Sequence, residues 1–214
     1  MFIRLLFTFC FLITLHVNAV AVASHDQSPA VLVLGDSLSA GFGIDQNKGW
    51  VKLLKQQLVK DNYSYQVINA SISGDTTSGG LARLNHALER YKPSIVIVEL
   101  GGNDGLQGLP ITEINKNLAA IITKCRNHGA KVLLIGMRLP PNYGINYTKS
   151  FHEVYVSLAK QFHVPLVPFL LEGVATHAEM MQEDGIHPRE IAQPMLLKNV
   201  WAQLRPLLDK SSTK

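Results

Sequence analysis

The sequence predicts an α/β domain built around a parallel β-sheet. Short apolar runs rich in β-branched residues alternate with longer stretches in which apolar residues recur at helical spacing, the pattern of strands joined by crossover helices. Polar, glycine-containing segments follow the first three runs, where loops would leave the sheet. The 214 residues, 47% of them hydrophobic, provide one sizeable core and too little chain for two ordinary domains. We therefore expect one domain over residues 24–214.

The first 23 residues are set apart from this domain by their composition. Arg4 precedes an apolar run over residues 5–15, and small residues follow at Ala21 and Ala23. This is the pattern of a secretory signal peptide, and the run is shorter than the roughly 20 residues that cross a bilayer. We expect export, cleavage near Ala23 and no stable membrane anchor afterwards.

Five strands and five helices are expected along the rest of the chain. The strands are predicted at residues 30–34, 66–68, 94–100, 131–135 and 165–167, and the helices at 50–60, 81–91, 113–127, 148–162 and 190–208. The helix over 113–127 has the strongest signals, because Thr112 can cap its start and Gly129 offers a left-handed stop. Cys125 lies on the apolar face of that helix and is the single cysteine after the signal peptide. We expect a small buried side chain there and no internal disulfide.

Ser37 follows the first predicted strand closely, in the polar segment 35–41. A hydroxyl at this strand-to-helix junction can point into the crevice that forms beyond the carboxyl ends of parallel strands. The alternative role for such a serine is a helix cap. The segment also lacks a complete G-x-S-x-G pattern, because Ser39 occupies the place of the second glycine. Ser37 is therefore a candidate nucleophile that needs a base to support the interpretation.

Two further loops supply hydrogen-bond donors at the same predicted edge of the sheet. The segment 71–78 contains Gly74, where a small residue lets a backbone N–H approach a substrate closely, and the segment 101–108 contains Asn103 among glycines. Together with the N–H of Ser37 they make three candidate donors to a developing oxyanion. Losing one such donor costs about 3 kcal/mol in the transition state. Simple turn chemistry explains each loop, taken alone, equally well.

The candidate base lies near the end of the chain, in the stretch from Asp184 to Pro188. A loop with Gly185 can turn the carboxylate back beside the imidazole of His187, and Pro188 biases that histidine away from helical backbone. One ring nitrogen would then face Asp184 and the other a serine hydroxyl, which is how a weak nucleophile is activated. A surface ion pair or half a metal site has the same spacing. The other histidines show no metal-ligand spacing, so no metal is expected.

Taken together, these segments resemble the SGNH (GDSL-type) hydrolases. Four stretches are similar to the four blocks of that family and come in the same order: Gly35-Asp-Ser-Leu38, Gly74, Gly102-Asn103-Asp104 and Asp184-Gly-Ile-His187. Residues 69–76, 98–106 and 138–144 resemble its bacterial periplasmic members that hydrolyse acyl-CoA thioesters, lysophospholipids and aryl esters. The resemblance implies a flavodoxin-like three-layer α/β/α sandwich with a five-stranded parallel sheet.

The resemblance also implies a mechanism and a location. Ser37, Asp184 and His187 would form a catalytic triad, and Ser37, Gly74 and Asn103 an oxyanion hole. Acyl esters and thioesters would be cleaved through an acyl-enzyme on Ser37, in the periplasm and without a cofactor. We expect a monomer that acts on a small molecule and has no nucleic-acid partner, since the net charge of +4 is spread along the chain without a basic run.

Apolar residues near the predicted site are candidates for binding the acyl chain. They are Leu106, Leu109, Ile111 and Tyr143. The same leucines would also serve to anchor their loop to the core. Met180 and Met181, just before the loop with the candidate base, fit either the far wall of an acyl pocket or a plain core role.

Two other interpretations are compatible with the residues. A carbohydrate O-acetylesterase would use the same triad on a different substrate. A non-catalytic acyl- or nucleotide-binding domain with a flavodoxin-like sheet would use the polar loops to hold a ligand. The second interpretation leaves the spacing of Asp184 and His187 unexplained, and no phosphate-binding G-x-x-x-x-G-K-[ST] stretch is present.

Overall fold

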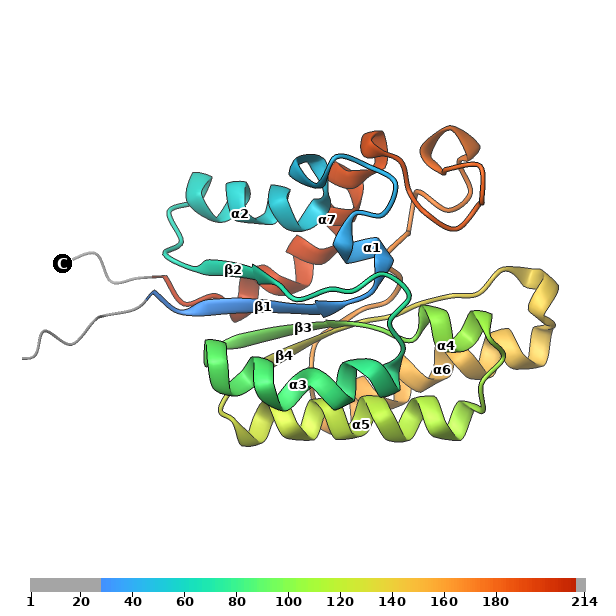
Figure 1. Cartoon of the computed structure of the whole chain (residues 1–214), viewed down its shortest axis with the longest axis horizontal. Coiled ribbons are helices and arrows are strands. Elements are labelled where there is room, and N and C mark those ends of the chain that lie inside the picture. The colour runs from blue at the N-terminus through green and yellow to red at the C-terminus, as the bar shows by residue number, and fades with distance from the viewer. Residues whose placement is uncertain (1–27, 211–214) are drawn as a thin grey trace, which may run out of the picture.

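The apolar runs form a five-stranded, all-parallel sheet in the computed structural model, which describes residues 28–210 (Figure 1). The strand order is β2-β1-β3-β4-β5. The strands are β1 (Ala30–Gly35), β2 (Gln66–Asn69), β3 (Ile95–Glu99), β4 (Lys131–Ile135) and β5 (Leu166–Val167). The predicted fold class and all five strands are confirmed, whereas the predicted signal peptide lies outside the described residues.

Helices cover both faces of the sheet (Figure 1). On one side lie α2 (Trp50–Lys60) and α7 (Gln193–Leu204), which pack on each other, and on the other side lie α3 (Thr77–Tyr91), α5 (Ile111–Asn127) and α6 (Ile145–Phe162). Two short helices, α1 (Ser37–Ala40) and α4 (Gly102–Leu106), follow β1 and β3 directly. None of the helices within residues 28–210 has both the length and the apolar character of a membrane span.

The sheet core explains why the strand sequences carry so little polarity. Every residue of β1 and β3 is buried, as expected for parallel strands covered by helices on both faces. The largest fully buried side chains around them include Trp50, Phe151 and Tyr155. Cys125 is fully buried on α5, and its burial raises the pKa of the thiol to about 12, so the predicted role as a small core side chain is confirmed.

Helix starts differ most from the sequence prediction. The helix α3 begins at Thr77 rather than Leu81, because the Thr76 hydroxyl caps it by accepting from the N–H of Gly79. The prediction that Thr112 caps the next helix is wrong: α5 begins at Ile111, two residues before the predicted start, with Pro110 at the capping position. The predicted stop at Gly129 is confirmed by its positive φ of 80°.

The last predicted helix, over residues 190–208, is broken into three pieces. A 3₁₀ turn (Glu190–Ala192) precedes α7, and a second 3₁₀ turn (Arg205–Leu207) follows it. Pro206 lies at the start of the second turn, and its missing N–H cannot continue the α-helical hydrogen-bond pattern. At the other end, α6 begins at Ile145, three residues before the predicted start.

Candidate active site

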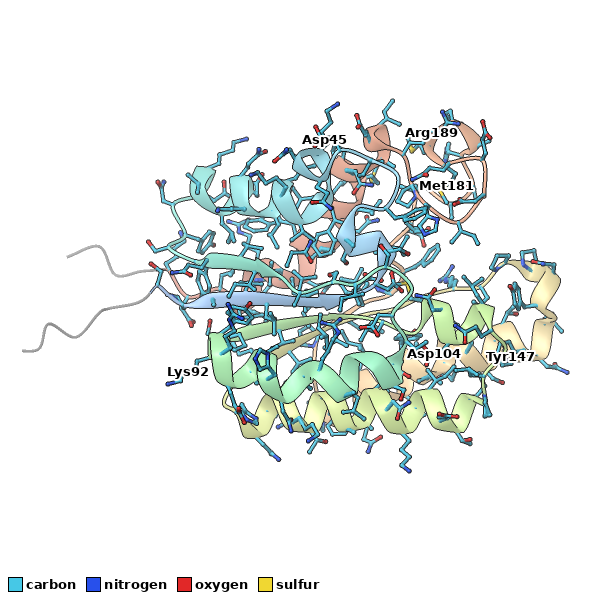
Figure 2. The ribbon with its side chains drawn as sticks, viewed as in Figure 1. Asp45, Lys92, Asp104, Tyr147, Met181 and Arg189 are labelled. Atoms are coloured by element: carbon cyan, nitrogen blue, oxygen red, sulfur yellow. The ribbon has the colours of Figure 1, made fainter. Side chains whose placement is uncertain are left out.

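The loops that follow β1, β2 and β3 meet at one end of the sheet. The chain passes from β1 outward to β2 and then returns across β1 to β3, so the connections diverge between β1 and β3 and leave a crevice at the carboxyl ends of the strands. Figure 2 shows Asp104 at this end of the molecule with Met181 and Arg189, whereas Lys92 lies toward the opposite end. Ser37 is the first residue of α1 and Asn103 the second residue of α4, the two short helices that start here.

The nucleophile candidate lies in a tight, buried turn. Asp36 caps α1 by accepting the N–H of Leu38 at 3.0 Å, and Ser37 is the first helical residue. The turn needs glycine at position 35, because a Cβ there would lie 2.6 Å from Oε2 of Glu99 on the neighbouring strand. Ser37 is 9% exposed, so this residue is nearly buried in the turn but is not closed off from solvent.

A chain of hydrogen bonds joins Ser37 to His187 and Asp184. The Nε2 atom of His187 lies 2.9 Å from Oγ of Ser37, and Nδ1 lies 2.6 Å from Oδ2 of Asp184. The other carboxylate oxygen, Oδ1, accepts the N–H groups of Ile186 at 2.9 Å and of His187 at 3.0 Å. Gly185, at a φ of 67°, allows this close turn. The structure therefore brings the three predicted triad residues together.

The electrostatics of this chain favour an ionised aspartate. Partial burial alone would raise the pKa of Asp184, but hydrogen bonds from the backbone and ring of His187 and from the N–H of Ile186 outweigh it and lower the pKa to about 2. An ionised Asp184 accepts a hydrogen bond from Nδ1–H of His187, which leaves Nε2 as the acceptor for the hydroxyl of Ser37. The arrangement can therefore take a proton from Ser37.

Of the three predicted oxyanion donors, the Asn103 amide is hydrogen-bonded to the residues next to the other two. Nδ2 of Asn103 donates to the carbonyl oxygen of Asp75 at 2.8 Å and lies 3.3 Å from Oδ2 of Asp36, so it bridges the neighbours of Gly74 and Ser37. No protein acceptor is found for the N–H groups of Ser37 and Gly74 among the described residues. Gly74 has a φ of 81° and open space around its α-carbon, which lets a substrate oxygen approach.

Arg83, on α3, ties the end of β1 to the loop that follows β2, and sequence reasoning did not find it. Its Nε donates to Oδ2 of Asp75 at 2.7 Å, and its Nη2 lies 3.3 Å from the carbonyl oxygen of Gly35. A further guanidinium nitrogen donates to the carbonyl oxygen of Ala70. Its position in the sequence gives no signal, because Arg90 on the same helix has a similar local context.

An aromatic residue beside the base was also missed. The ring centroid of Phe42 lies 4.5 Å from that of His187, and half of the Phe42 side chain is exposed. Gln182 fixes this contact through two hydrogen bonds. Its side-chain Nε2 donates to the carbonyl oxygen of Phe42 at 2.9 Å, and its backbone N–H donates to the carbonyl oxygen of His187 at 2.7 Å. Ile72 and Ile186, 53% and 37% exposed, add apolar surface on the two adjoining loops.

The predicted acyl-binding residues have mixed surroundings. Leu109 packs partly against the core, and its carbonyl oxygen accepts the hydroxyl of Tyr147 at 2.7 Å. Ile111 also packs on the core and lines a surface hollow between α5 and α6. Leu106 and Tyr143 are half-buried, at the end of α4 and in the 3₁₀ turn Pro141–Tyr143. A role for these four in acyl binding stays a prediction.

The two methionines differ in burial. Met181 is buried and forms an isolated antiparallel bridge with Pro188, which favours the core role. Met180 is partly buried against the same core.

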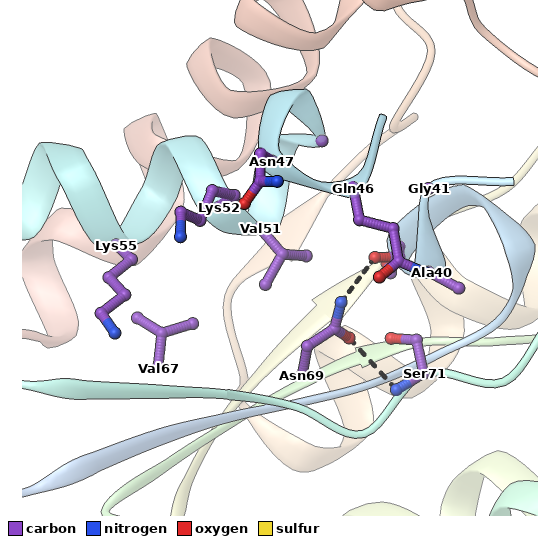
Figure 3. A pocket seen from close by; sticks show the side chains of 12 residues that line it. Ala40, Gly41, Gln46, Asn47, Val51, Lys52, Lys55, Val67, Asn69 and Ser71 are labelled. Carbon is purple, nitrogen blue, oxygen red and sulfur yellow. Dashed lines mark hydrogen bonds between the residues drawn. The ribbon is translucent and has the colours of Figure 1, made fainter. Parts of the chain in front are cut away.

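A separate cavity of about 430 Å³ lies behind the nucleophile turn, between α2 and the edge strand β2 (Figure 3). Lys52 and Lys55 line it from α2, and Asn69 lines it from β2. Nδ2 of Asn69 donates to the carbonyl oxygen of Ser39 at 2.8 Å, so this wall supports the turn from behind. The triad residues do not line this cavity.

Comparisons with known proteins find a matching family and several similar proteins. The sequence model of the GDSL-like Lipase/Acylhydrolase family matches residues 33–193. The chain is 52% identical over 189 residues to "Esterase TesA" of Pseudomonas aeruginosa, covering 88% of this chain and 94% of that protein. It is 44% identical over 182 residues to "Arylesterase" of Vibrio mimicus, covering 85% and 91%.

A third relative and a solved structure extend the comparison. The chain is 42% identical over 204 residues to "Thioesterase 1/protease 1/lysophospholipase L1" of Escherichia coli K12, covering 95% of this chain and 94% of that protein. A crystal structure of TesA superposes with a TM-score of 0.82 at 54% sequence identity, covering 84% of this chain and 99% of that one. Likeness therefore extends over nearly the whole described chain in both sequence and fold.

Proposed function

The chain belongs to the GDSL-like lipase/acylhydrolase family, and we propose that it cleaves carboxylic esters and thioesters through an acyl-enzyme on Ser37. The observation that carries this proposal is the unbroken hydrogen-bond chain from Asp184 through His187 to Oγ of Ser37. A binding domain would not need that chain. It supplies what an ester hydrolase needs, a serine hydroxyl with a base and a group that orients the base.

The mechanism follows from these positions. Nε2 of His187 takes the proton of Ser37 as Oγ attacks the acyl carbonyl carbon, and the resulting imidazolium is stabilised by ionised Asp184. The N–H groups of Ser37 and Gly74 and the amide of Asn103 would donate to the oxyanion of the tetrahedral intermediate. Collapse transfers the proton from His187 to the leaving alcohol or thiol. Water, activated by the same imidazole, then releases the acid and restores Ser37.

In the oxyanion hole, Asn103 must exchange one contact. Its amide has two N–H hydrogens, and the stronger bond, to the carbonyl oxygen of Asp75 at 2.8 Å, fixes its orientation. The weaker 3.3 Å contact to Asp36 is the one that a substrate oxyanion replaces or shares.

The substrate class follows from the relatives and from the surface beside His187. The relatives are named as an esterase, an arylesterase and a thioesterase/lysophospholipase, and we propose the same classes of substrate for this chain. The exposed ring of Phe42 and the side chains of Ile72 and Ile186 offer apolar contacts to an aryl group or acyl chain. A carboxylic ester or thioester with an apolar group on either side of the carbonyl suits this surface.

We also propose that the protein acts in the periplasm after removal of residues 1–23, and that it is a monomer. The support for export is the basic start, apolar run and small residues of that segment. Mass spectrometry of protein isolated from the periplasmic fraction should give a chain that begins at Ser24. An intact chain in the cytoplasm would contradict export, and sedimentation of the purified protein tests the monomer.

The test of the function is hydrolysis of acyl-CoA, aryl ester and lysophospholipid panels by the wild type and by Ser37→Ala. We expect the variant to lose activity by on the order of 10⁴-fold or more on every substrate that the wild type cleaves. Ser157→Ala, at an exposed position on α6, is the matched control and should behave as the wild type. Equal activity of Ser37→Ala and wild type would remove Ser37 from the mechanism. A panel that prefers acetyl groups on sugars would favour the carbohydrate O-acetylesterase instead.

A further inference from the structure

Glu99 is a fully buried carboxyl group that the mechanism above does not use. It ends β3 and lies opposite Gly35 of β1 in the sheet register. Its Oε2 atom accepts the N–H of Asp36 at 3.2 Å and the hydroxyl of Ser39 at 2.5 Å. Because Asp36 and Ser39 flank Ser37 in the turn, Glu99 supports the nucleophile turn from below.

The other oxygen of Glu99 has an unusual environment. No N–H or O–H donor reaches Oε1, although this atom is buried. The neighbouring acidic group is the carboxyl of Asp36, which is 2% exposed and close enough for its charge to raise the pKa of Glu99. Two ionised carboxylates cannot share such a contact away from water, whereas a single proton between them converts repulsion into a hydrogen bond.

Asp36 connects this pair to the reacting groups. Its Oδ1 atom accepts the N–H of Leu38 and so fixes the first turn of α1, on which Ser37 lies. Its Oδ2 atom lies 3.3 Å from Nδ2 of Asn103. The orientation of the Asp36 carboxylate therefore affects both the nucleophile turn and the side chain predicted to bind the oxyanion.

We propose that Glu99 is protonated at neutral pH and donates a hydrogen bond to ionised Asp36, and that this buried carboxyl pair positions Ser37 and Asn103. The proton belongs on Oε1, because Oε2 already accepts two hydrogen bonds. Glu99 touches no substrate in this arrangement, so it is a positioning residue. Its effect on the reaction rests on the proposed function, but its protonation does not.

The electrostatic surroundings agree with a neutral Glu99 and an ionised Asp36. Burial raises the pKa of both groups, that of Asp36 to about 6 and that of Glu99 well above its ordinary value, where the charge of Asp36 adds to the effect. Three other titratable groups face the pair. His187 lowers the pKa of Asp36 and Asp75 raises it, and Tyr155 reaches the pair from α6, where it is buried. Above about pH 6 Asp36 is therefore the ionised member.

The protonation is tested by the pH dependence of unfolding, without any substrate. In the unfolded chain Glu99 is ionised at any pH above its ordinary pKa, so folding takes up a proton. The stability that this proton provides is lost as pH rises towards the folded-state pKa. Around pH 7, each added pH unit should raise the equilibrium constant for unfolding of the wild type about tenfold more than that of Glu99→Gln. Parallel curves for the two proteins would show that Glu99 is ionised in the native state and would overturn the proposal.

The positioning role is tested by kinetics on an aryl ester. Glutamine has a carbonyl oxygen that can accept as Oε2 of Glu99 does, and an NH₂ group that can donate to Asp36 where protonated glutamate has an O–H, so Glu99→Gln should keep kcat within a few-fold of the wild type. Glu99→Leu cannot bond to Asp36 or Ser39 and should lower kcat between about tenfold and 100-fold with little change in KM. Equal kcat values for these two variants would overturn the positioning role.

Two controls separate the possible failures. Val98→Ala, at a fully buried position on the same strand, should lower stability but keep both the kcat and the pH dependence of the wild type. If Glu99→Leu does not fold, the unfolding curves of wild type and Glu99→Gln still decide the protonation. If Ser37→Ala kept full activity, the proposed function would fail while the proton uptake on folding would be unchanged.

Discussion

At the scale of single residues, Asp184 combines exposure with a strongly stabilised charge. Its side chain is 38% exposed, yet three hydrogen bonds from Ile186 and His187 hold its pKa near 2. Water therefore reaches the carboxylate without displacing it from the imidazole. The same bonds that keep the aspartate ionised also fix the orientation of His187, so its electrostatic and positioning roles are inseparable in this loop.

We predict that Asp184→Asn lowers kcat by roughly 10³- to 10⁴-fold with little effect on KM. The amide can donate to Nδ1 of His187 and would favour the tautomer in which Nε2 carries the proton and cannot accept from Ser37. Steady-state kinetics on an aryl ester measures the effect, with Glu183→Gln, at the exposed neighbouring position, as the control. A loss smaller than tenfold would show that the carboxylate does not set the tautomer.

The same aspartate gives a pH-dependent stability with a defined direction. Because folding lowers its pKa from 3.8 to about 2, its contribution is present above about pH 4 and is lost as pH falls towards 2. The difference in unfolding free energy between wild type and Asp184→Asn should therefore shrink across that interval, as measured by denaturant titrations. A difference that stayed constant down to pH 2 would contradict the hydrogen-bond assignment.

We predict that Phe42 contributes to substrate binding rather than to chemistry. Phe42→Ala removes the apolar ring beside His187 and should raise KM for aryl and long-acyl esters about tenfold, while KM for acetyl esters and kcat change by less than about threefold. Phe42→Leu, which keeps an apolar side chain, should restore most of the affinity for long acyl chains. An equal rise in KM for acetyl and long-acyl substrates would show that the ring only holds the imidazole.

At the scale of elements, α3 is the connector between the loops. Arg83 reaches from this helix to Asp75 and to the carbonyl oxygens of Gly35 and Ala70, so one side chain fixes the ends of β1 and β2 and the loop of Gly74. The ion pair with Asp75 is largely buried, with 24% and 10% of the two side chains exposed. Breaking such a pair leaves a charge without its partner, which is more costly than losing a surface pair.

We predict that Arg83→Met lowers kcat by about tenfold or more and the free energy of unfolding by about 3 kcal/mol. Methionine keeps the apolar part of the side chain but cannot bond to the carbonyl oxygens, so the Gly74 loop loses its support. Arg90→Met on the same helix is the matched control and should change neither quantity appreciably. Urea denaturation and aryl ester kinetics measure both, and a normal kcat in Arg83→Met would show that the loop holds its shape without the arginine.

The strands could be predicted because their apolar runs are short, β-branched and bounded by polar loops, and all five are present in the structure. The helix starts could not be predicted equally well, because they depend on which side chain caps the first backbone N–H groups of the helix. The start of α3 contains Gly79 and Gly80, which read as a loop in sequence. In the structure Gly80 lies inside the helix and packs closely on Leu100, since a Cβ there would lie 2.3 Å from Cδ1 of that side chain.

The site shows the same division between local pattern and tertiary contact. Ser37, Asn103 and His187 could be proposed from the motifs around them, and the structure brings all three to the same end of the sheet. Glu99 and Arg83 could not, because their importance comes from which buried groups they face. A glutamate ending an apolar strand was the one available signal, since an acidic residue is seldom fully buried without a partner.

At the scale of the whole molecule, the site depends on closure between the two ends of the chain. Ser37 and His187 are 150 residues apart in sequence and 2.9 Å apart at their reacting atoms. Contacts between early and late segments hold this closure. Oε1 of Gln193 accepts the N–H of Trp50 at 2.9 Å, and Nζ of Lys48 donates to Glu190 at 2.7 Å. The packing of α2 on α7 thus helps to hold His187 beside Ser37.

The most direct test of this account is the site and rate of covalent labelling by a fluorophosphonate, followed by peptide mass spectrometry. We predict a single adduct on Oγ of Ser37 in the wild type, a rate at least 10³-fold slower in His187→Ala because the base is lost, and an unchanged rate in the exposed-site control His177→Ala. An adduct on another residue, or equal labelling rates for wild type and His187→Ala, would contradict the claim that His187 activates Ser37.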